Sequence, residues 1–241
     1  MRQKRLVKKV ELMNFKKMQR LSHYLFGTLA VLLMAACTID AYDKGEGEYS
    51  LLTAEMADIT VGSDKYTTSV VTDLGEQLHL TKPYTVKWME KGDTTYRALV
   101  YYKLLTDRKA EIVSMSKVGV LVPHELKEKD GKPQEAMKTD PVYVESIWMS
   151  KNKKYVNMRL RLLTGTSEDE KAVQTVGMIR DKANSSSDHD YIMLYHDQGG
   201  QPEYYSTTAF ISIPLDEVKT DTLTIAVNTY DGLLTRTMVD L

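Results

Sequence analysis

Residues Tyr155-Val156-Asn157-Met158-Arg159-Leu160-Arg161-Leu162 alternate between apolar and polar side chains over a full strand length. Successive side chains of a β-strand point to opposite faces, so Val156, Met158, Leu160 and Leu162 share one face. The intervening polar residues, two of them arginines, share the other face. One buried face and one solvated face are typical of an antiparallel sheet, and this stretch therefore favours a β-sandwich.

The same period of two recurs through the second half of the chain. Ala209, Ile211 and Ile213 repeat it, and so do Leu223, Ile225 and Val227. Tyr230-Asp231-Gly232 reads as the turn of a hairpin. About seven short strands in roughly a hundred residues fit a sandwich. We therefore predict an antiparallel β-sandwich over residues 141–241.

The first half also has a β pattern, with turn signals at short intervals. Strand candidates are Arg97–Leu105 and Glu111–Val122, the latter with Val118, Val120 and Val122 alternating. About five strands between residues 50 and 123 suit a small Greek-key barrel such as the OB-fold. Residues 123–141 are rich in charge and contain Pro123, Pro133 and Pro141, which indicates a linker over residues 124–140. The expected fold class is all-β: an N-terminal OB-like Greek-key barrel followed by the sandwich.

An export signal precedes both halves. The apolar run Leu25–Cys37 follows Lys16, Lys17 and Arg20, and it ends in Ala35-Ala36-Cys37. A basic segment, a short apolar segment and small residues predict a secretory signal peptide, and a cysteine at this point resembles a bacterial lipobox. The run is shorter than the roughly 20 residues of a spanning helix. We expect cleavage after residue 36, acylation of Cys37 and a polar tether over residues 37–49. Met13 and Met18 stay open as start codons beside Met1.

Charge narrows the class of partner. The chain has 32 basic and 33 acidic side chains, and residues 1–36 hold eight of the basic and one of the acidic ones, which leaves a net charge of −8 after cleavage. Residues 50–123 carry nine of each sign. Neither balance gives the positive footprint that nucleic acid requires, so we predict no nucleic-acid partner.

The order of these features resembles the NigD-like lipoproteins of the Bacteroidetes. The resemblance rests on the lipobox cysteine with its acidic tether, on the alternating C-terminal strands and on five segments: Tyr101–Leu105, Val118–Pro123, Asp140–Trp148, Lys154–Leu160 and Tyr191–Asp197. It implies an OB-like N-terminal domain, a C-terminal β-sandwich, an outer-membrane lipoprotein, no enzyme activity and no cofactor. The family's name comes from an association with bacteriocin gene clusters. Only Asp40 and Asp43 are acidic directly after Cys37, so the resemblance leaves the periplasmic and surface sides of the membrane open.

Candidate catalytic and metal-binding groups do not form a motif. The four histidines after Cys37 are too few and too scattered for the three or four convergent ligands of a zinc site: His79, His124, His189 and His196. Ser185–His189 brings serine, aspartate and histidine together only in a loop, whereas a triad needs a rigid arrangement. Glu168-Asp169-Glu170 indicates a solvated hairpin tip. We predict no catalytic residue and no metal site.

Aromatic residues of the first half offer one ligand hypothesis. Tyr84, Trp88 and Tyr101 are candidate contacts for a neutral glycan, with core packing as the alternative role. The predicted function is a membrane-anchored, non-catalytic binding or accessory module for an envelope protein or a neutral glycan. The alternative is a bacteriocin-associated lipoprotein acting in immunity or delivery.

Overall fold

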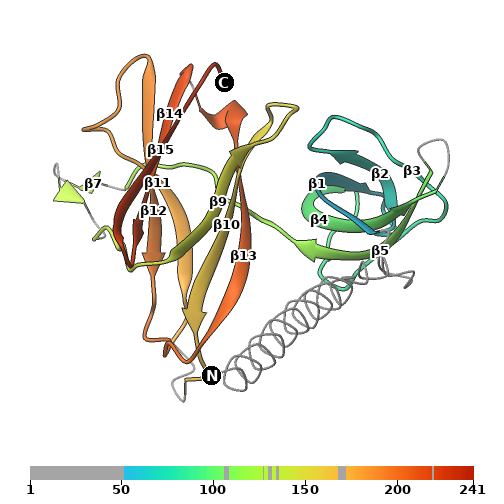
Figure 1. The fold of residues 1–241 in the computed structure, drawn as a ribbon, viewed down its shortest axis with the longest axis horizontal. Coiled ribbons are helices and arrows are strands. Elements are labelled where there is room, and N and C mark those ends of the chain that lie inside the picture. The colour runs from blue at the N-terminus through green and yellow to red at the C-terminus, as the bar shows by residue number, and fades with distance from the viewer. Residues whose placement is uncertain are drawn as a thin grey trace, which may run out of the picture. The chain divides into compact units, whose positions relative to one another are not determined.

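The structure is a computed structural model that describes residues 52–105, 109–126, 128–129, 132–133, 136–167, 172–218 and 220–241. Residues Leu51–Leu241 make one compact unit, most of whose strands are labelled in Figure 1. The predicted signal peptide, Cys37, the tether and the carboxylate run at 168–170 lie outside the described residues. Within the described ranges, no helix has the length and apolarity to cross a bilayer.

Five strands of the first half form one sheet in the order β2-β1-β4-β5-β3. Their bounds are β1 Leu52–Val61, β2 Thr67–Thr72, β3 His79–Leu80, β4 Thr94–Leu104 and β5 Lys109–Lys117. The two ends of the sheet meet, because the N–H of Leu78 donates to the carbonyl of Val70 at 2.9 Å next to a bridge between Val71 and Gln77. A nearly closed five-stranded barrel confirms the OB-like prediction.

Two four-stranded sheets form the second half, in the orders β6-β13-β10-β9 and β11-β12-β14-β15. Their strands are β6 Gly119–Val120, β9 Tyr143–Met149, β10 Tyr155–Thr164, β11 Thr175–Arg180, β12 His189–Asp197, β13 Tyr205–Pro214, β14 Thr222–Thr229 and β15 Gly232–Val239. A short β7–β8 pair, Glu128–Lys129 with Lys132–Pro133, and the 3-10 turn η1, Leu215–Glu217, complete the unit. The predicted sandwich is confirmed.

The core follows from the alternation in the sequence. Val156, Met158 and Leu160 of β10 are fully buried, and Leu162 is nearly so. They pack against Leu223, Ile225 and Val227 of β14, which are also fully buried. The predicted turn at Tyr230-Asp231 joins β14 to β15. Burial of these aliphatic side chains is the main driving force for this half, at roughly 25 cal/mol per Å² of apolar surface.

Two pairings in the sandwich are parallel, β6 with β13 and β12 with β14. The second covers only the first half of β12, because the chain after residue 137 inserts beyond it. His196 donates its N–H to the carbonyl of Lys138, and Asp140 donates to the carbonyl of His196, each at 3.0 Å. Val142 in turn donates to Asn228 of β14. The two ends of the predicted linker, residues 124–140, are therefore hydrogen-bonded into the sandwich, the first end through His124 and β11.

The chain passes from one half to the other without an intervening loop. Strand β5 ends at Lys117, Val118 is buried, and β6 begins at Gly119 in a sandwich sheet. The predicted alternation of Val118, Val120 and Val122 ends here, since Val120 and Val122 are exposed. The change of sheet interrupts the strand on which that alternation would have continued.

Strand β15 is the last strand of its sheet in the described part of the chain. Its Arg236 lies opposite Ile225 of β14, so the two side chains share the core-facing side. Ile225 is fully buried, whereas the side chain of Arg236 is exposed to solvent.

Candidate functional site

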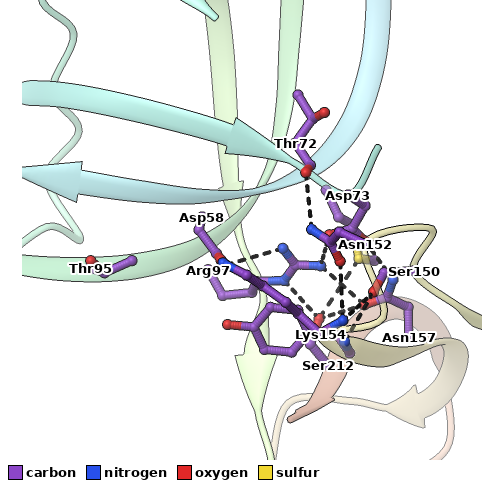
Figure 2. A network of polar contacts seen from close by, with 12 residues as sticks. Asp58, Thr72, Asp73, Thr95, Arg97, Ser150, Asn152, Lys154, Asn157 and Ser212 are labelled. Atoms are coloured by element: carbon purple, nitrogen blue, oxygen red, sulfur yellow. Dashed lines mark hydrogen bonds and ion pairs between the residues drawn. The ribbon is translucent and has the colours of Figure 1, made fainter. Parts of the chain in front are cut away.

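A network of polar contacts among the described residues surrounds Arg97, near the start of β4 (Figure 2). Its guanidinium donates to Asp58 Oδ1 at 3.2 Å and to Asp73 Oδ1 at 2.5 Å, both from the barrel. It also donates to Ser212 Oγ at 3.1 Å and to Asn157 Oδ1 at 3.3 Å, both from the sandwich. The Arg97 side chain is only 2% exposed, so a buried cation joins the two halves.

The sandwich residues of this cluster are themselves linked to the barrel. Asn157 donates from Nδ2 to Asp73 Oδ2 at 2.7 Å, and Ser212 donates to Asn157 Oδ1 at 2.7 Å. Lys154 lies 3.5 Å from Asp58 Oδ2. The positive charges of Arg97 and Lys154 balance the negative charges of Asp58 and Asp73. Their attraction offsets the free-energy cost of removing a charged group from water.

Tyr155 covers the guanidinium, whose Cζ lies 4.0 Å from the ring centroid. Burial raises the pKa of Tyr155 to about 12, helped by the carboxylate of Asp58 and opposed by Arg97. The hydroxyl therefore stays protonated and hydrogen-bonds to Asp58. Every group named here holds another in place, so the cluster fixes the barrel against the sheet that contains β10 and β13.

The three aromatic residues predicted as glycan contacts do not meet on one surface. Tyr84 and Trp88 are partly buried against the barrel core, where the Tyr84 hydroxyl donates to the carbonyl of Val113 at 3.1 Å. Trp88 makes an edge contact with Tyr96. Tyr101 packs instead against the separate apolar cluster of Met56, Leu99 and Val118. A glycan role for the three stays a prediction, and the structure does not bring Tyr101 to the other two.

The histidines lie apart and have local partners. His196, next to the end of β12, is buried, and its Nδ1 lies 2.8 Å from the carbonyl of Asp140. His189 Nε2 lies 2.8 Å from Thr224 Oγ1. His124 bridges to the edge of β11, and His79 is an exposed residue of β3. Among the described residues, no three His, Cys, Asp or Glu side chains gather as metal ligands would.

Ser185–His189 forms the loop that leads into β12. Ser185 Oγ donates to the carbonyl of Asp181 at 2.7 Å, and Ser186 Oγ bonds to Asp188 at 2.6 Å. The N–H of Ser186 donates to the carbonyl of His189 at 2.7 Å, but the His189 ring bonds to Thr224 and not to a serine hydroxyl of this described loop, so the triad geometry is not formed.

An aromatic surface that the sequence analysis missed lies at one end of the sandwich. Tyr143 and Tyr230 stack with ring centroids 4.6 Å apart, and Arg161 lies 4.6 Å from the Tyr143 ring. The Tyr230 hydroxyl lies 3.4 Å from a carboxylate oxygen of Glu203. Next to Glu203, Tyr204 is 80% exposed and Tyr205 is 56% exposed. We call these six residues the tyrosine surface.

The tyrosine surface draws on four separate segments of the chain. Tyr143 begins β9, Arg161 lies on β10, Glu203 to Tyr205 lead into β13, and Tyr230 lies in the β14–β15 turn. Only the exposed pair Tyr204-Tyr205 next to turn residues was a signal in the sequence. The stack itself depends on a pairing 87 residues apart, which no local pattern predicts.

Residues 125–241 match the family of NigD-like C-terminal beta sandwich domains. The second half of the chain is thus similar to the NigD-like domains. The match confirms the resemblance that the sequence segments carry. The tyrosine surface and the sandwich side of the Arg97 cluster therefore both lie in the NigD-like domain, whereas Arg97 itself comes from the barrel before it.

Solved structures extend the likeness to most of the described chain. A NigD-like immunity protein from Bacteroides caccae shares 23% identity with a TM-score of 0.58, covering 76% of this chain and 91% of that chain. A candidate toxin-related protein from Parabacteroides distasonis shares 16% identity with a TM-score of 0.59, covering 78% of this chain and 92% of that chain. A candidate lipoprotein from Bacteroides fragilis shares 10% identity with a TM-score of 0.54, covering 78% of this chain and 96% of that chain. At these identities the likeness concerns the fold alone. No curated protein matches the chain.

Proposed function

We propose that this NigD-like protein is a non-catalytic outer-membrane lipoprotein that binds a protein partner in the cell envelope through the tyrosine surface. The stack of Tyr143 on Tyr230 with Arg161 and two exposed tyrosines is the observation that carries the proposal. Tyrosine and arginine are enriched among the residues that dominate binding energy at protein interfaces. Exposed aromatic groups rimmed by polar side chains mark interaction sites.

The geometry of the surface supports a protein rather than an acidic polymer. Arg161 is engaged with Tyr143, and Glu203 lies beside Tyr230, so the surface is close to neutral. Tyrosine has few rotatable bonds and loses little conformational entropy on binding, while its hydroxyl accepts or donates a hydrogen bond at the rim. A neutral glycan that stacks on the tyrosines is the second ligand class.

Anchoring rests on the lipobox-like segment that ends in Cys37. Two or more acyl chains anchor a protein stably to a bilayer, whereas one gives marginal binding. Cys37→Ala should abolish metabolic labelling by a palmitate analogue and release the protein from outer-membrane fractions. A variant that still labels and still sediments with membranes would contradict the anchor and leave the binding proposal standing.

Photo-crosslinking in intact cells tests the binding surface. Benzoylphenylalanine at position 204 should give a discrete adduct of defined mass, and the same group at Tyr66, an exposed tyrosine of the barrel, should not. Adding Tyr230→Ala to the position-204 protein should remove the adduct, because it removes the stack with Tyr143 and the contact with Glu203, the neighbour of position 204. An adduct from both positions, or one unaffected by Tyr230→Ala, would refute the surface. Loss of the adduct after enzymatic removal of glycans would assign the glycan class.

A bacteriocin-associated role is the second candidate function. The likeness in fold to a NigD-like immunity protein and to a candidate toxin-related protein favours it. On this hypothesis the partner at the tyrosine surface is a bacteriocin or its receptor. Deleting the gene should then make cells at least tenfold more sensitive to the bacteriocin, and the wild-type protein, not the Tyr204→Ala/Tyr205→Ala variant, should restore resistance.

A further inference from the structure

Two adjoining cavities lie beside β11 and β12, away from the residues of the tyrosine surface. The first has a volume of about 330 Å³ and apolar walls made by Leu126, Met137, Ile179, Ala183 and Met193. The second has a volume of about 390 Å³ and polar walls that include Ser185, Ser186, Asp190 and Thr220. Glu125, Arg180 and Lys182 line both cavities, so the two share a wall.

The apolar cavity has a floor set by strand register. Ile179 of β11 lies directly opposite Met193 of β12, and both side chains are on the outer face of their sheet. Leu126 and Met137, from the segment between the two halves, complete the walls. A cavity of this volume lies within the range that small ligands occupy, and its apolar walls favour a group that water solvates poorly.

The polar cavity contains one buried acceptor that the protein leaves unsatisfied. Asp190 receives a hydrogen bond on Oδ1 from Arg180 Nε at 2.8 Å, and its side chain is 6% exposed. Its Oδ2 is buried and has no hydrogen-bond partner among the described residues. Such a group costs about 1–3 kcal/mol, so it favours any ligand that supplies a donor.

We propose that the two cavities form one binding site for a small amphiphile. Its apolar part fills the first cavity on the outer face of the sheet, and the ligand turns past the end of β11 at Arg180, where the two cavities adjoin. A hydroxyl or ammonium head then donates to Asp190 Oδ2 on the opposite face, where Asp190 pairs with Leu223. Arg180 is already bonded to Asp190 and to the carbonyl of Glu217, and Lys182 is paired with Glu125 at 2.8 Å. Because the cations are engaged and the open group is an acceptor, an anionic head is disfavoured.

The ion pair of Lys182 and Glu125 controls access between the cavities. Both side chains are about half exposed, and pairs of this kind contribute little net stability. A ligand that spans both cavities parts this pair and gains the hydrogen bond to Asp190 in return. The site shares no residue with the tyrosine surface and does not depend on the proposed function.

The test uses residues 38–241, which contain the whole compact unit Leu51–Leu241. With methyl-labelled methionine, hexylammonium and hexan-1-ol should shift the signals of Met137 and Met193 saturably in NMR titrations. Met89, buried in the barrel core, should not shift. Hexanoate should bind at least tenfold more weakly than either, because its carboxylate faces another acceptor. Absent shifts at Met193, or equal binding of all three probes, would overturn the proposal.

Two variants separate the parts of the site. Ala183→Trp, at an exposed turn residue on the apolar wall, should weaken hexylammonium binding at least tenfold, whereas Ala54→Trp, at an exposed alanine of β1, should leave it unchanged. Asp190→Asn keeps an acceptor for Arg180 and turns a donor toward the ligand. It should lower the preference for hexylammonium over hexanoate at least tenfold. Should Asp190→Asn fail to fold, unchanged binding by Ala183→Trp would by itself refute the site.

Discussion

Arg97 Nε donates a hydrogen bond to Ser212 Oγ at 3.1 Å across 115 residues of sequence. One residue belongs to the OB-like barrel and the other to the NigD-like sandwich, and the bond is buried. The two halves are therefore joined by a polar contact that water does not weaken, in addition to the direct passage from β5 to β6.

Removal of the guanidinium should destabilise the whole unit. Arg97→Met leaves the carboxylates of Asp58 and Asp73 without their main partner in a buried place, at a cost of about 3–5 kcal/mol in the free energy of unfolding. Urea unfolding followed by circular dichroism measures it. The control Lys117→Met, at an exposed cation of β5, should change stability by less than about 0.5 kcal/mol. Equal losses of unfolding free energy in the two variants would contradict a stabilising role of the Arg97 cluster.

A cavity made in the sandwich core should lower the free energy of unfolding independently of the Arg97 cluster. Met158 is fully buried between the two sheets, so Met158→Ala should lower the free energy of unfolding by about 2–5 kcal/mol. Thr208→Ala, at an exposed position of β13, serves as the control in the same urea titration. A loss for Met158→Ala no larger than that of the control would place the core elsewhere.

Tyr102, which is buried, and Tyr155, which is partly buried, should make the protein sensitive to alkali. Burial raises the pKa of Tyr155 to about 12 and that of Tyr102 to about 12, from an ordinary value of 10.0. Their contribution to stability is fully present below pH 10, where both states are protonated, and it is lost as pH rises to 12 because the unfolded chain releases its protons first. Thermal unfolding midpoints should fall between pH 10 and 12.

The Tyr102→Phe variant isolates this effect. The decline in its midpoint over that range should be shallower than in the wild type, while Tyr66→Phe, at an exposed residue, should decline like the wild type. An identical slope in all three proteins would rule out Tyr102 as a source of the pH dependence.

Proteolysis probes the proposed linker at residues 124–140. Its charged composition offers trypsin Lys127 and Lys129, so we expect the first cut there. The two fragments should nevertheless elute together in size-exclusion chromatography, because β6, which precedes the cut, pairs with β13, and Arg97 binds Ser212. In Arg97→Met the nicked fragments should separate. First cuts inside either half would contradict the boundary.

Sequence patterns predicted the elements whose environment repeats along the chain. In β10 every second side chain meets the same core, so alternation alone placed Val156, Met158 and Leu160 inside. The turn at Tyr230-Asp231 was predicted for a different reason: the residues of a tight turn determine its geometry locally. Alternation failed at Val120 and Val122, because the strand leaves one sheet for another at Gly119.

The candidate sites could not be predicted from the sequence, because they are formed by contacts between residues that are not neighbours in the chain. Arg97 reads as an ordinary polar residue at the start of a strand, and only the approach of Asp73, Asn157 and Ser212 shows it to be buried. The Tyr143–Tyr230 stack and the Ile179–Met193 floor likewise join distant segments. The parallel pairing of β12 with β14 was missed because Leu223, Ile225 and Val227 alternate in the same way in either strand direction.

The lipid anchor proposed at Cys37 would hold many copies of the protein on one membrane, and the position of Arg236 has a consequence for such copies. A terminal strand with free backbone groups is a template for the same strand of a neighbouring molecule, and confinement to a surface raises the frequency of such encounters. Arg236 lies on the side that faces the core, opposite Ile225, so edge-to-edge pairing would carry its charge toward an apolar interface. The arginine thus acts against aggregation, at a strand whose exposed Leu233 and Leu234 would otherwise promote it.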